Sequence, residues 1–246
     1  MNKQYESVYH DVELKNWWFA ARRSFIKSLL AKYKVAKDAS IIDIGCAGGV
    51  LLYELAQDGF TDLTALDYSA EAIELCKQRG IAQAYVMDGH NPEFPDNSFD
   101  VVIASDSLEH LKDDELALRN WYRILKPGGR AFIFVPAYQS LWSEHDVVNY
   151  HFRRYTKKNL TAKALAAGFR RLQGGYWNNA LLIPTALMRL IKGAPKEGAK
   201  LDEGGDIVAL PAPLNAAVTA WLRMEGFFSK MIPMPAGVST FIVVTK

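Results

Sequence analysis

The chain has 246 residues, a length sufficient for one domain with a well-buried core. Half of its residues are hydrophobic and 23% are charged, which excludes disorder over the chain as a whole. Its 29 Lys and Arg residues against 27 Asp and Glu leave a formal net charge of +2, which is too small to favour nucleic acid as a partner. We therefore expect a single domain over residues 1–246 that binds small molecules.

Cysteine content and hydropathy limit the setting further. Cys46 and Cys76 are too few for a disulfide framework. Residues 1–10 lack the apolar run of a signal peptide, and the apolar stretch Ala180–Ile191 is about half the length that a bilayer requires. These features predict a cytoplasmic protein without a transmembrane segment, although peripheral contact with a membrane stays open.

The first predicted element is a helix over Glu13–Tyr33, part of an N-terminal helical cap over residues 1–35 that we expect to pack on the upper edge of a sheet. From Ile41 onward, short β-branched runs alternate with helical patterns, which is typical of βαβ units and a mostly parallel sheet. The expected strands are Ser40–Ile44, Leu63–Leu66, Ala84–Met87, Asp100–Ser105 and Arg130–Val135. The expected helices are Val50–Gln57, Ala70–Gln78, Asp113–Leu125 and Lys157–Ala167.

Two further strands, Arg170–Gly175 and Ser239–Thr245, enclose a segment that breaks this alternation. It spans about residues 177–237 and reads as a helical insertion, acting as a lid or a dimer face. Within it we expect an apolar stretch at Leu181–Ile191, a polar loop at Gly193–Asp206 and a helix at Pro213–Met231. Its large apolar side chains fit an acceptor pocket, a subunit contact, membrane adhesion or simple core burial, so monomer and homodimer both remain open; they are Trp177, Met224, Phe227, Phe228 and Met231.

A glycine-rich turn follows the first strand, with the sequence Asp43-Ile44-Gly45-Cys46-Ala47-Gly48-Gly49. Small residues where a strand reverses into a helix let the backbone approach a ligand, so the turn predicts a nucleotide site. Asp67 ends the next strand about 20 residues on, where a carboxylate can accept hydrogen bonds from a ribose. The NAD fingerprint is disfavoured because its third and sixth positions would be Ala47 and Val50.

Five stretches of the chain together resemble the small-molecule class I S-adenosylmethionine-dependent methyltransferases of the ubiquinone-biosynthesis type. They are Ile41–Gly49, Leu66-Asp67, Asp88-Gly89, Phe94–Asp100 and Leu125–Gly129. The resemblance covers about residues 40–136. It implies an α/β fold with a doubly wound, mostly parallel seven-stranded sheet of the Rossmann-like methyltransferase type. It also implies S-adenosylmethionine as cofactor and methyl transfer to a small-molecule, natural-product or lipid-linked acceptor.

The same resemblance assigns roles to matched positions. Gly45 and Gly49 would hold the turn around the methionine part, and Asp67 would clamp the ribose. Arg22 would pair the cofactor carboxylate, with a solvated helix face for Arg22 and Arg23 as the alternative. The full predicted cofactor set is Asp43, Gly45, Cys46, Ala47, Gly49, Asp67, Tyr68 beside the adenine, Asp88 at its amine, Gly89, Ser105 and Arg22. Asp43 could instead only cap the turn through backbone amides.

The acceptor half of the site is sought at the carboxyl ends of the strands. In-line transfer from a sulfonium needs alignment above all, but an oxygen or carbon acceptor must also lose a proton. We expect His145 or His151 to deprotonate or orient the acceptor. The other candidates are His110 and Tyr155 for catalysis, and Arg153, Arg154 and Trp177 for substrate binding.

Each acceptor-side assignment has a structural alternative. The two arginines could tie the loop to acidic residues, Tyr155 could pack in the core, and His110 could be bonded within the protein. No metal is expected, because His145, Asp146 and His151 lack a third ligand at helical spacing.

Two other functions compete with an active methyltransferase. One is a catalytically idle S-adenosylmethionine-binding scaffold, and the other is a nicotinamide oxidoreductase. A nucleic-acid base methyltransferase is disfavoured because the Asn/Asp-Pro-Pro-Tyr/Phe motif is absent. Binding of S-adenosylmethionine separates the oxidoreductase from the rest, and formation of S-adenosylhomocysteine separates the enzyme from the scaffold.

Overall fold

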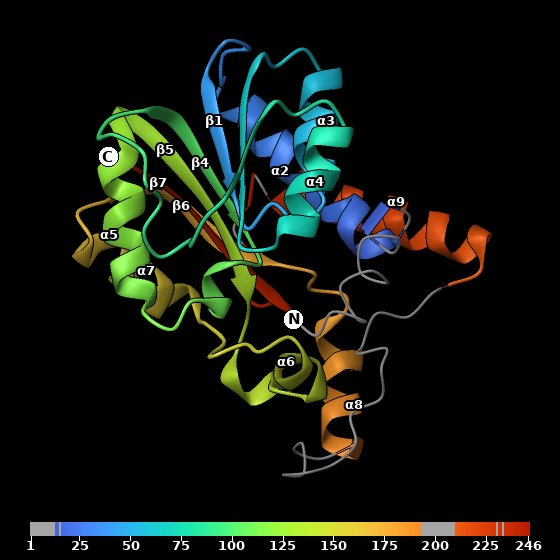
Figure 1. The fold of residues 1–246 in the computed structure, drawn as a ribbon. Helices are drawn as coiled ribbons and strands as arrows, with labels where there is room; N and C mark the ends of the chain where they lie inside the picture. The colour runs from blue at the N-terminus through green and yellow to red at the C-terminus, as the bar shows by residue number, and fades with distance from the viewer. Residues whose placement is uncertain (1–12, 15, 193–209, 230, 233) are drawn as a thin grey trace.

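The computed structural model describes residues 13–14, 16–192, 210–229, 231–232 and 234–246 (Figure 1). The N-terminal residues 1–10 and the predicted polar loop Gly193–Asp206 therefore lie outside the described residues. No helix in the described part of the chain is long and apolar enough to cross a membrane.

A seven-stranded sheet forms the centre of the molecule, with the order β3-β2-β1-β4-β5-β7-β6. β7 runs antiparallel to both of its neighbours, whereas the pairs from β3 to β5 are all parallel. The predicted doubly wound, mostly parallel sheet is thereby confirmed. The strands are β1 (Ser40–Ile44), β2 (Asp62–Asp67), β3 (Gln83–Val86), β4 (Phe99–Ser105), β5 (Leu125–Pro136), β6 (Arg170–Trp177) and β7 (Ser239–Thr245).

Helices cover both faces of the sheet. Several begin where a short polar side chain accepts a backbone N–H of the first turn, as Ser69 and Asp113 do from Ala72 and Leu116. The described helices are α2 (Trp17–Lys32), α3 (Val50–Gln57), α4 (Ala70–Gln78), α5 (Asp114–Ile124), α6 (Glu144–Val148), α7 (Lys157–Ala166), α8 (Leu182–Lys192) and α9 (Ala212–Ser229). Two short 3-10 turns, Leu108–His110 and Gln139–Leu141, lie after β4 and β5.

The core has two layers because alternate residues of each central strand point to opposite faces. In β4, Val101 and Ile103 pack with α2, α3 and α4, whereas Val102 and Ala104 pack with α5 and α7. Figure 1 shows these two groups of helices on either side of the sheet. Burial on both faces explains why the strands read as continuous apolar runs.

β5 begins earlier than its sequence pattern predicts. The expected helix ran to Leu125 and the expected strand began at Arg130, but Leu125 already pairs with Phe99 and the register of β4 and β5 shifts before Val101. Gly129 fits this irregular start because a Cβ there would lie 2.8 Å from the carbonyl oxygen of Lys126. The chain therefore passes directly from α5 into the strand.

α2 packs on a face of the sheet rather than on its upper edge. The Phe25 ring lies 5.0 Å from that of Phe241 and 5.8 Å from that of Phe134. On its other side α2 meets α9, where a Cβ added to Gly226 would lie 3.3 Å from the Phe25 ring. The apolar side chains of α2 thus join the central core; they are Ala21, Phe25, Ile26, Leu29 and Leu30.

Candidate active site

The glycine-rich turn lies at the carboxyl end of β1 and is bonded to the adjacent strand. The N–H groups of Gly45 and Cys46 donate to the carbonyl oxygen of Leu66, at 2.8 and 3.1 Å. Gly45 and Gly49 have φ angles of 76° and 75°, in the left-handed region. A Cβ at Gly45 would lie 2.5 Å from the Cβ of Ser107, so the turn needs glycine there for two reasons.

Asp67 links this turn to the end of β2. One carboxylate oxygen accepts the Ala47 N–H and the other accepts the Ser69 N–H, both at 2.9 Å. These two backbone bonds fix the orientation of the carboxylate at the end of β2. Next to it, Tyr68 is 84% exposed. The predicted pair of Asp67 and the glycine turn is therefore brought together.

Asp43 is a buried carboxyl group directly beneath the turn. Its Oδ1 has no hydrogen-bond partner among the described residues, so this oxygen does not cap the turn. Burial, with the negative charges of Glu13 and Asp67 adding to it, raises the pKa of Asp43 to about 8. A positively charged ligand would lower that pKa again, because it favours the ionised form.

Arg22 lies inside the protein, and the alternative of a solvated helix face is wrong for it. Its side chain is 3% exposed and sits 2.6 Å from the carboxylate of Asp106. It also donates to the hydroxyl groups of Ser105 and Ser239 at 3.3 and 3.1 Å. Arg23 is buried as well, with Nε 2.8 Å from Glu54. Helix α2 lies flat on the sheet, so this polar face is covered.

A small pocket lies between the glycine-rich turn and helix α2. It is lined by Asp43, Gly45, Cys46 and Ala47 on one side, by Ser105 and Asp106 from β4, and by Glu13, Phe19, Arg22, Arg23, Ile26 and Leu51. Six of the eleven residues predicted to bind the cofactor therefore line one space. Asp67, Tyr68, Asp88, Gly89 and Gly49 are not among the lining residues.

Asp88 lies on the surface after β3, with a partner that the sequence reading missed. It accepts the backbone N–H of His90 at 2.9 Å and lies 2.7 Å from its Nδ1. Burial acts to raise the pKa of Asp88, but these bonds outweigh it and hold the pKa below its usual value. The sequence signal for this contact is the two-residue spacing from Asp88 to His90, because an Asp side chain commonly accepts the backbone N–H two residues further on.

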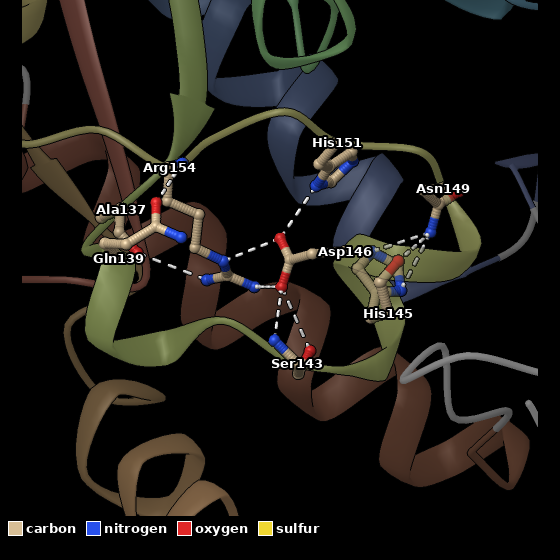
Figure 2. A network of polar contacts seen from close by, with 8 residues as sticks. All are labelled: Ala137, Gln139, Ser143, His145, Asp146, Asn149, His151 and Arg154. Atoms are coloured by element: carbon tan, nitrogen blue, oxygen red, sulfur yellow. Dashed lines mark hydrogen bonds and ion pairs between the residues drawn. The ribbon is translucent and has the colours of Figure 1, made fainter. Parts of the chain in front are cut away.

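The loop after β5 is organised around one fully buried carboxylate, Asp146 (Figure 2). Arg154 donates to both of its oxygens at 2.8 Å through Nε and Nη2. His151 Nδ1 lies 2.8 Å from Oδ1, and the Ser143 N–H donates to Oδ2 at 2.9 Å. Burial opposes ionisation, but the bonds from His151 and Arg154 hold the pKa of Asp146 well below its usual range.

Several predicted acceptor-side residues serve the structure of this loop instead. Arg153 lies 2.9 Å from a carboxylate oxygen of Asp114, and Tyr155, which is 1% exposed, donates to the same oxygen at 2.8 Å. Arg154 is bound to Asp146 as described. The structure thus agrees with the alternative in which both arginines tie the loop down and Tyr155 packs in the core.

Trp177 is also part of the core rather than of the pocket lining. It is fully buried and its ring stacks on Phe25 at 5.5 Å. The Arg22 guanidinium lies 5.0 Å from the centre of the indole, which is a cation–π contact. Trp177 therefore packs against the Arg22 guanidinium and helps to fix its position.

Three histidines, His110, His145 and His151, lie close to one another. The rings of His110 and His151 lie 4.5 Å apart and nearly perpendicular, and those of His145 and His151 lie 5.9 Å apart. Burial, with the charge of His151, lowers the pKa of His110 to about 3. The Asn149 amide nitrogen lies 3.3 Å from a ring nitrogen of His145. His110 and His151 form the tighter pair.

Glu109 is a site residue that the sequence reading missed. It is fully buried, and neither of its carboxylate oxygens has a hydrogen-bond partner in the part of the chain described. Burial, followed by the negative charge of Asp106, raises its pKa well above the usual value. Asp106 lines the pocket, and its charge acts on Glu109. Only its place directly before His110 could have indicated this.

The chain is similar to known methyltransferases over its central part. Residues 42–133 match the family profile described as "Methyltransferase domain". The ubiquinone biosynthesis O-methyltransferase of Proteus mirabilis is 33% identical over 99 residues, which are 37% of this chain and 40% of the relative. The chain thus spans about two fifths of the length of that curated relative. The resemblance predicted from the sequence is confirmed over this region.

Solved structures extend the likeness of the fold to nearly the whole chain. A SAM-dependent methyltransferase from Archaeoglobus fulgidus superposes with a TM-score of 0.57 at 17% identity, covering 97% of this chain and 99% of that one. A phosphoethanolamine N-methyltransferase of Haemonchus contortus gives a TM-score of 0.57 at 18% identity, covering 89% of this chain and 52% of that one. The latter structure holds phosphomonomethylethanolamine and S-adenosylhomocysteine.

Proposed function

We propose that this chain, which contains a class I S-adenosylmethionine-dependent methyltransferase domain, transfers the methyl group of that cofactor to a small-molecule acceptor. The observation that carries the proposal is the pocket in which the glycine turn, buried Asp43 and Arg22 meet. An unpaired buried carboxyl suits a ligand that brings positive charge, and a buried guanidinium suits one that also carries a carboxylate. The amino acid end of S-adenosylmethionine carries both.

Different residues around the turn are assigned to different parts of the cofactor. Asp43 and Arg22 take the charged methionine end, and Gly45 and Ala47 let the backbone approach it. Asp67 takes the ribose hydroxyls, because its orientation is already fixed by two backbone bonds. Tyr68 and Asp88 lie further along the same strand ends, where the adenine would extend.

The acceptor side is assigned to His110 and His151. Asp146 fixes the His151 ring, whereas His145 stands further from the pair. In the reaction a lone pair of the acceptor forms the new bond to the methyl carbon. The electrons of the carbon–sulfur bond return to sulfur, and the acceptor proton leaves to a base or to solvent.

The class of acceptor follows from the relatives only in outline. One is named for O-methylation in ubiquinone biosynthesis, and another is named for N-methylation and was solved with phosphomonomethylethanolamine. Their acceptor atoms differ, so the proposal is a small-molecule, natural-product or lipid-linked acceptor. We further propose that residues 1–246 act as one domain, because α9 of the 177–237 segment packs on α2 beside the pocket.

The test is the formation of S-adenosylhomocysteine when the purified chain is incubated with S-adenosylmethionine and a panel of phenols, catechols, amines and quinol precursors. The proposal expects product with at least one class, and its loss in Asp67→Asn. Asp62→Asn at the opposite end of β2 is the matched control and should keep the activity. Binding without product across the panel would favour the idle scaffold, and binding of NAD instead would favour the oxidoreductase.

A further inference from the structure

We infer that Glu109, His110 and His151 form a binding site for one divalent transition-metal ion. Each side chain offers one ligand atom, and these atoms lie within 4.8 Å of one another. Two ligands of the same ion, each about 2.1 Å from it, are at most about 4.2 Å apart. Side-chain rotations that move these ligand atoms by about an ångström would therefore bring all three within bonding distance of one ion.

The buried Glu109 carboxyl is an independent indication of a cation. A carboxylate removed from water without a partner is costly, and in the described structure neither oxygen of Glu109 is hydrogen-bonded. Its side chain is fully buried, so water outside the protein does not compensate. A metal ion at the histidines would supply the missing partner.

His151 is already held as metal-binding histidines usually are. Its Nδ1 is bonded to Asp146, which leaves the lone pair on Nε2 available for a ligand bond (Figure 2). Asp146 is in turn fixed by Arg154 and Ser143. A carboxylate behind the histidine sets the orientation and basicity of the ring in most such sites.

The backbone holds the two halves of the site together. Glu109 and His110 belong to the short turn after β4, whereas His151 comes from the loop after β5. The Phe152 N–H donates to the Glu109 carbonyl oxygen at 2.8 Å, which places His151 against that turn. The sequence search for metal-ligand spacing failed because the ligands are about 40 residues apart and only the sheet brings them together.

The donor set selects the kind of ion. Two imidazole nitrogens and one carboxylate oxygen suit Zn²⁺, Fe²⁺, Co²⁺ or Mn²⁺, whereas Mg²⁺ and Ca²⁺ prefer oxygen ligands alone. Three protein ligands leave at least one coordination position for water or substrate, which is typical of catalytic sites. Within the described ranges this is the one such group of ligands.

The position of the site gives it a role that rests on the proposed methyl transfer. Glu109 lies close enough to Asp106 and Arg22 for their charges to act on it, and both residues line the pocket. An acceptor hydroxyl bound to the ion would lose its proton to solvent more readily, because the ion lowers its pKa. The resulting oxygen anion attacks the methyl carbon and the sulfur departs as the neutral thioether. The structure thus favours a hydroxyl compound as acceptor.

The experiment is a titration of chelator-treated, full-length protein with Co²⁺, followed by visible absorption and calorimetry. We expect one Co²⁺ per chain with absorption bands of a histidine-coordinated ion, displaced by Zn²⁺. Glu109→Gln and His151→Gln should weaken binding about 100-fold or more, and Asp146→Asn about 10–100-fold. His90→Gln, which changes a histidine outside the cluster, should bind as the unchanged chain does.

Two results would overturn the inference: no stoichiometric Co²⁺ binding, or equal binding by the unchanged chain and folded Glu109→Gln, with folding checked by circular dichroism. Both readouts are independent of the reaction. Metal binding without S-adenosylmethionine binding would therefore reject the proposed function and keep the metal site. Methyl transfer by a chain that takes up no Co²⁺ in the titration would reject the metal site and keep the proposed function.

Discussion

Asp43 is the residue at which cofactor binding should be most visible. Its pKa of about 8 means that at pH 7 the carboxyl is mostly protonated in the unliganded protein. A cationic ligand lowers this pKa, so binding of S-adenosylmethionine at pH 7 should release up to about one proton. This release of a proton should be much smaller at pH 9, because Asp43 is then already mostly ionised in the unliganded protein.

Calorimetry in buffers of different ionisation enthalpy measures this proton directly. Asp43→Asn should bind the cofactor more weakly and release no proton from this position. A heat of binding that is the same in all buffers at pH 7 for the unchanged chain would contradict the assignment of Asp43 to the charged end of the cofactor.

Replacing Gly45 should lower the stability of the fold itself. Gly45→Ala meets both a left-handed φ and a Cβ placed 2.5 Å from that of Ser107, so we expect a loss of about 2–5 kcal/mol in the free energy of unfolding. Gly59→Ala has a φ of 91° but nothing within 4 Å, so it should lose only about 1–2 kcal/mol. Urea unfolding measures both. Equal losses would show that the contact with Ser107 is unimportant.

Residue roles were predictable where they follow local spacing and were missed where they depend on tertiary packing. Asp67 and the glycine turn sit at fixed offsets from a strand end, and the structure brings them together. Glu109 shows no periodic signal, because its burial results from the loop that packs over it. For Arg22 the sequence left a solvated helix face as the alternative to a cofactor role, and only the packing of Trp177 and Asp106 around it excludes that alternative.

At the scale of elements, the first turn of α5 anchors the loop after β5. Burial acts to raise the pKa of Asp114, but hydrogen bonds from Lys163, Tyr155 and Arg153 outweigh it and hold the pKa below its usual value. A depressed pKa stabilises the fold above the unfolded-state value of about 4 and loses that contribution as pH falls through the folded value.

Asp114→Asn should therefore lower the free energy of unfolding by about 1–3 kcal/mol between pH 5 and 8. The difference from the unchanged chain should shrink as pH falls below about 4, because Asp114 takes up a proton first in the unfolded state and, at lower pH, in the folded state. Glu115→Gln removes an exposed partner of the same Lys163 and should cost less than about 1 kcal/mol. A difference independent of pH down to pH 2 would exclude the charge of Asp114 as the cause.

Most central elements were predictable because their patterns are strong. The strands β1 and β7 and the helices α3 and α4 match the expected bounds, since each carries a clear apolar run or helical apolar spacing. Helix α6 was not predicted, because it has five residues and its capping box depends on Asp146, which serves the loop network. The early start of β5 depends on pairing with Phe99, which no local pattern reports.

Over the whole molecule, the two ends of the chain converge on the proposed site. α2 supplies Arg22 to the pocket, β7 supplies Ser239 to the same guanidinium, and α9 packs behind α2. The family likeness covers residues 42–133, so these outer elements lie beyond it.

The central claim is that the turn, Asp43 and Asp67 bind S-adenosylmethionine. Its most direct test is the dissociation constant of that cofactor for the unchanged chain, Asp67→Asn and the control Asp62→Asn, measured by calorimetry. We predict one site per chain, weakened about 10–100-fold by Asp67→Asn through loss of charged hydrogen bonds, and unchanged in the control. Absence of binding, or equal binding by Asp67→Asn and the unchanged chain, would contradict the account.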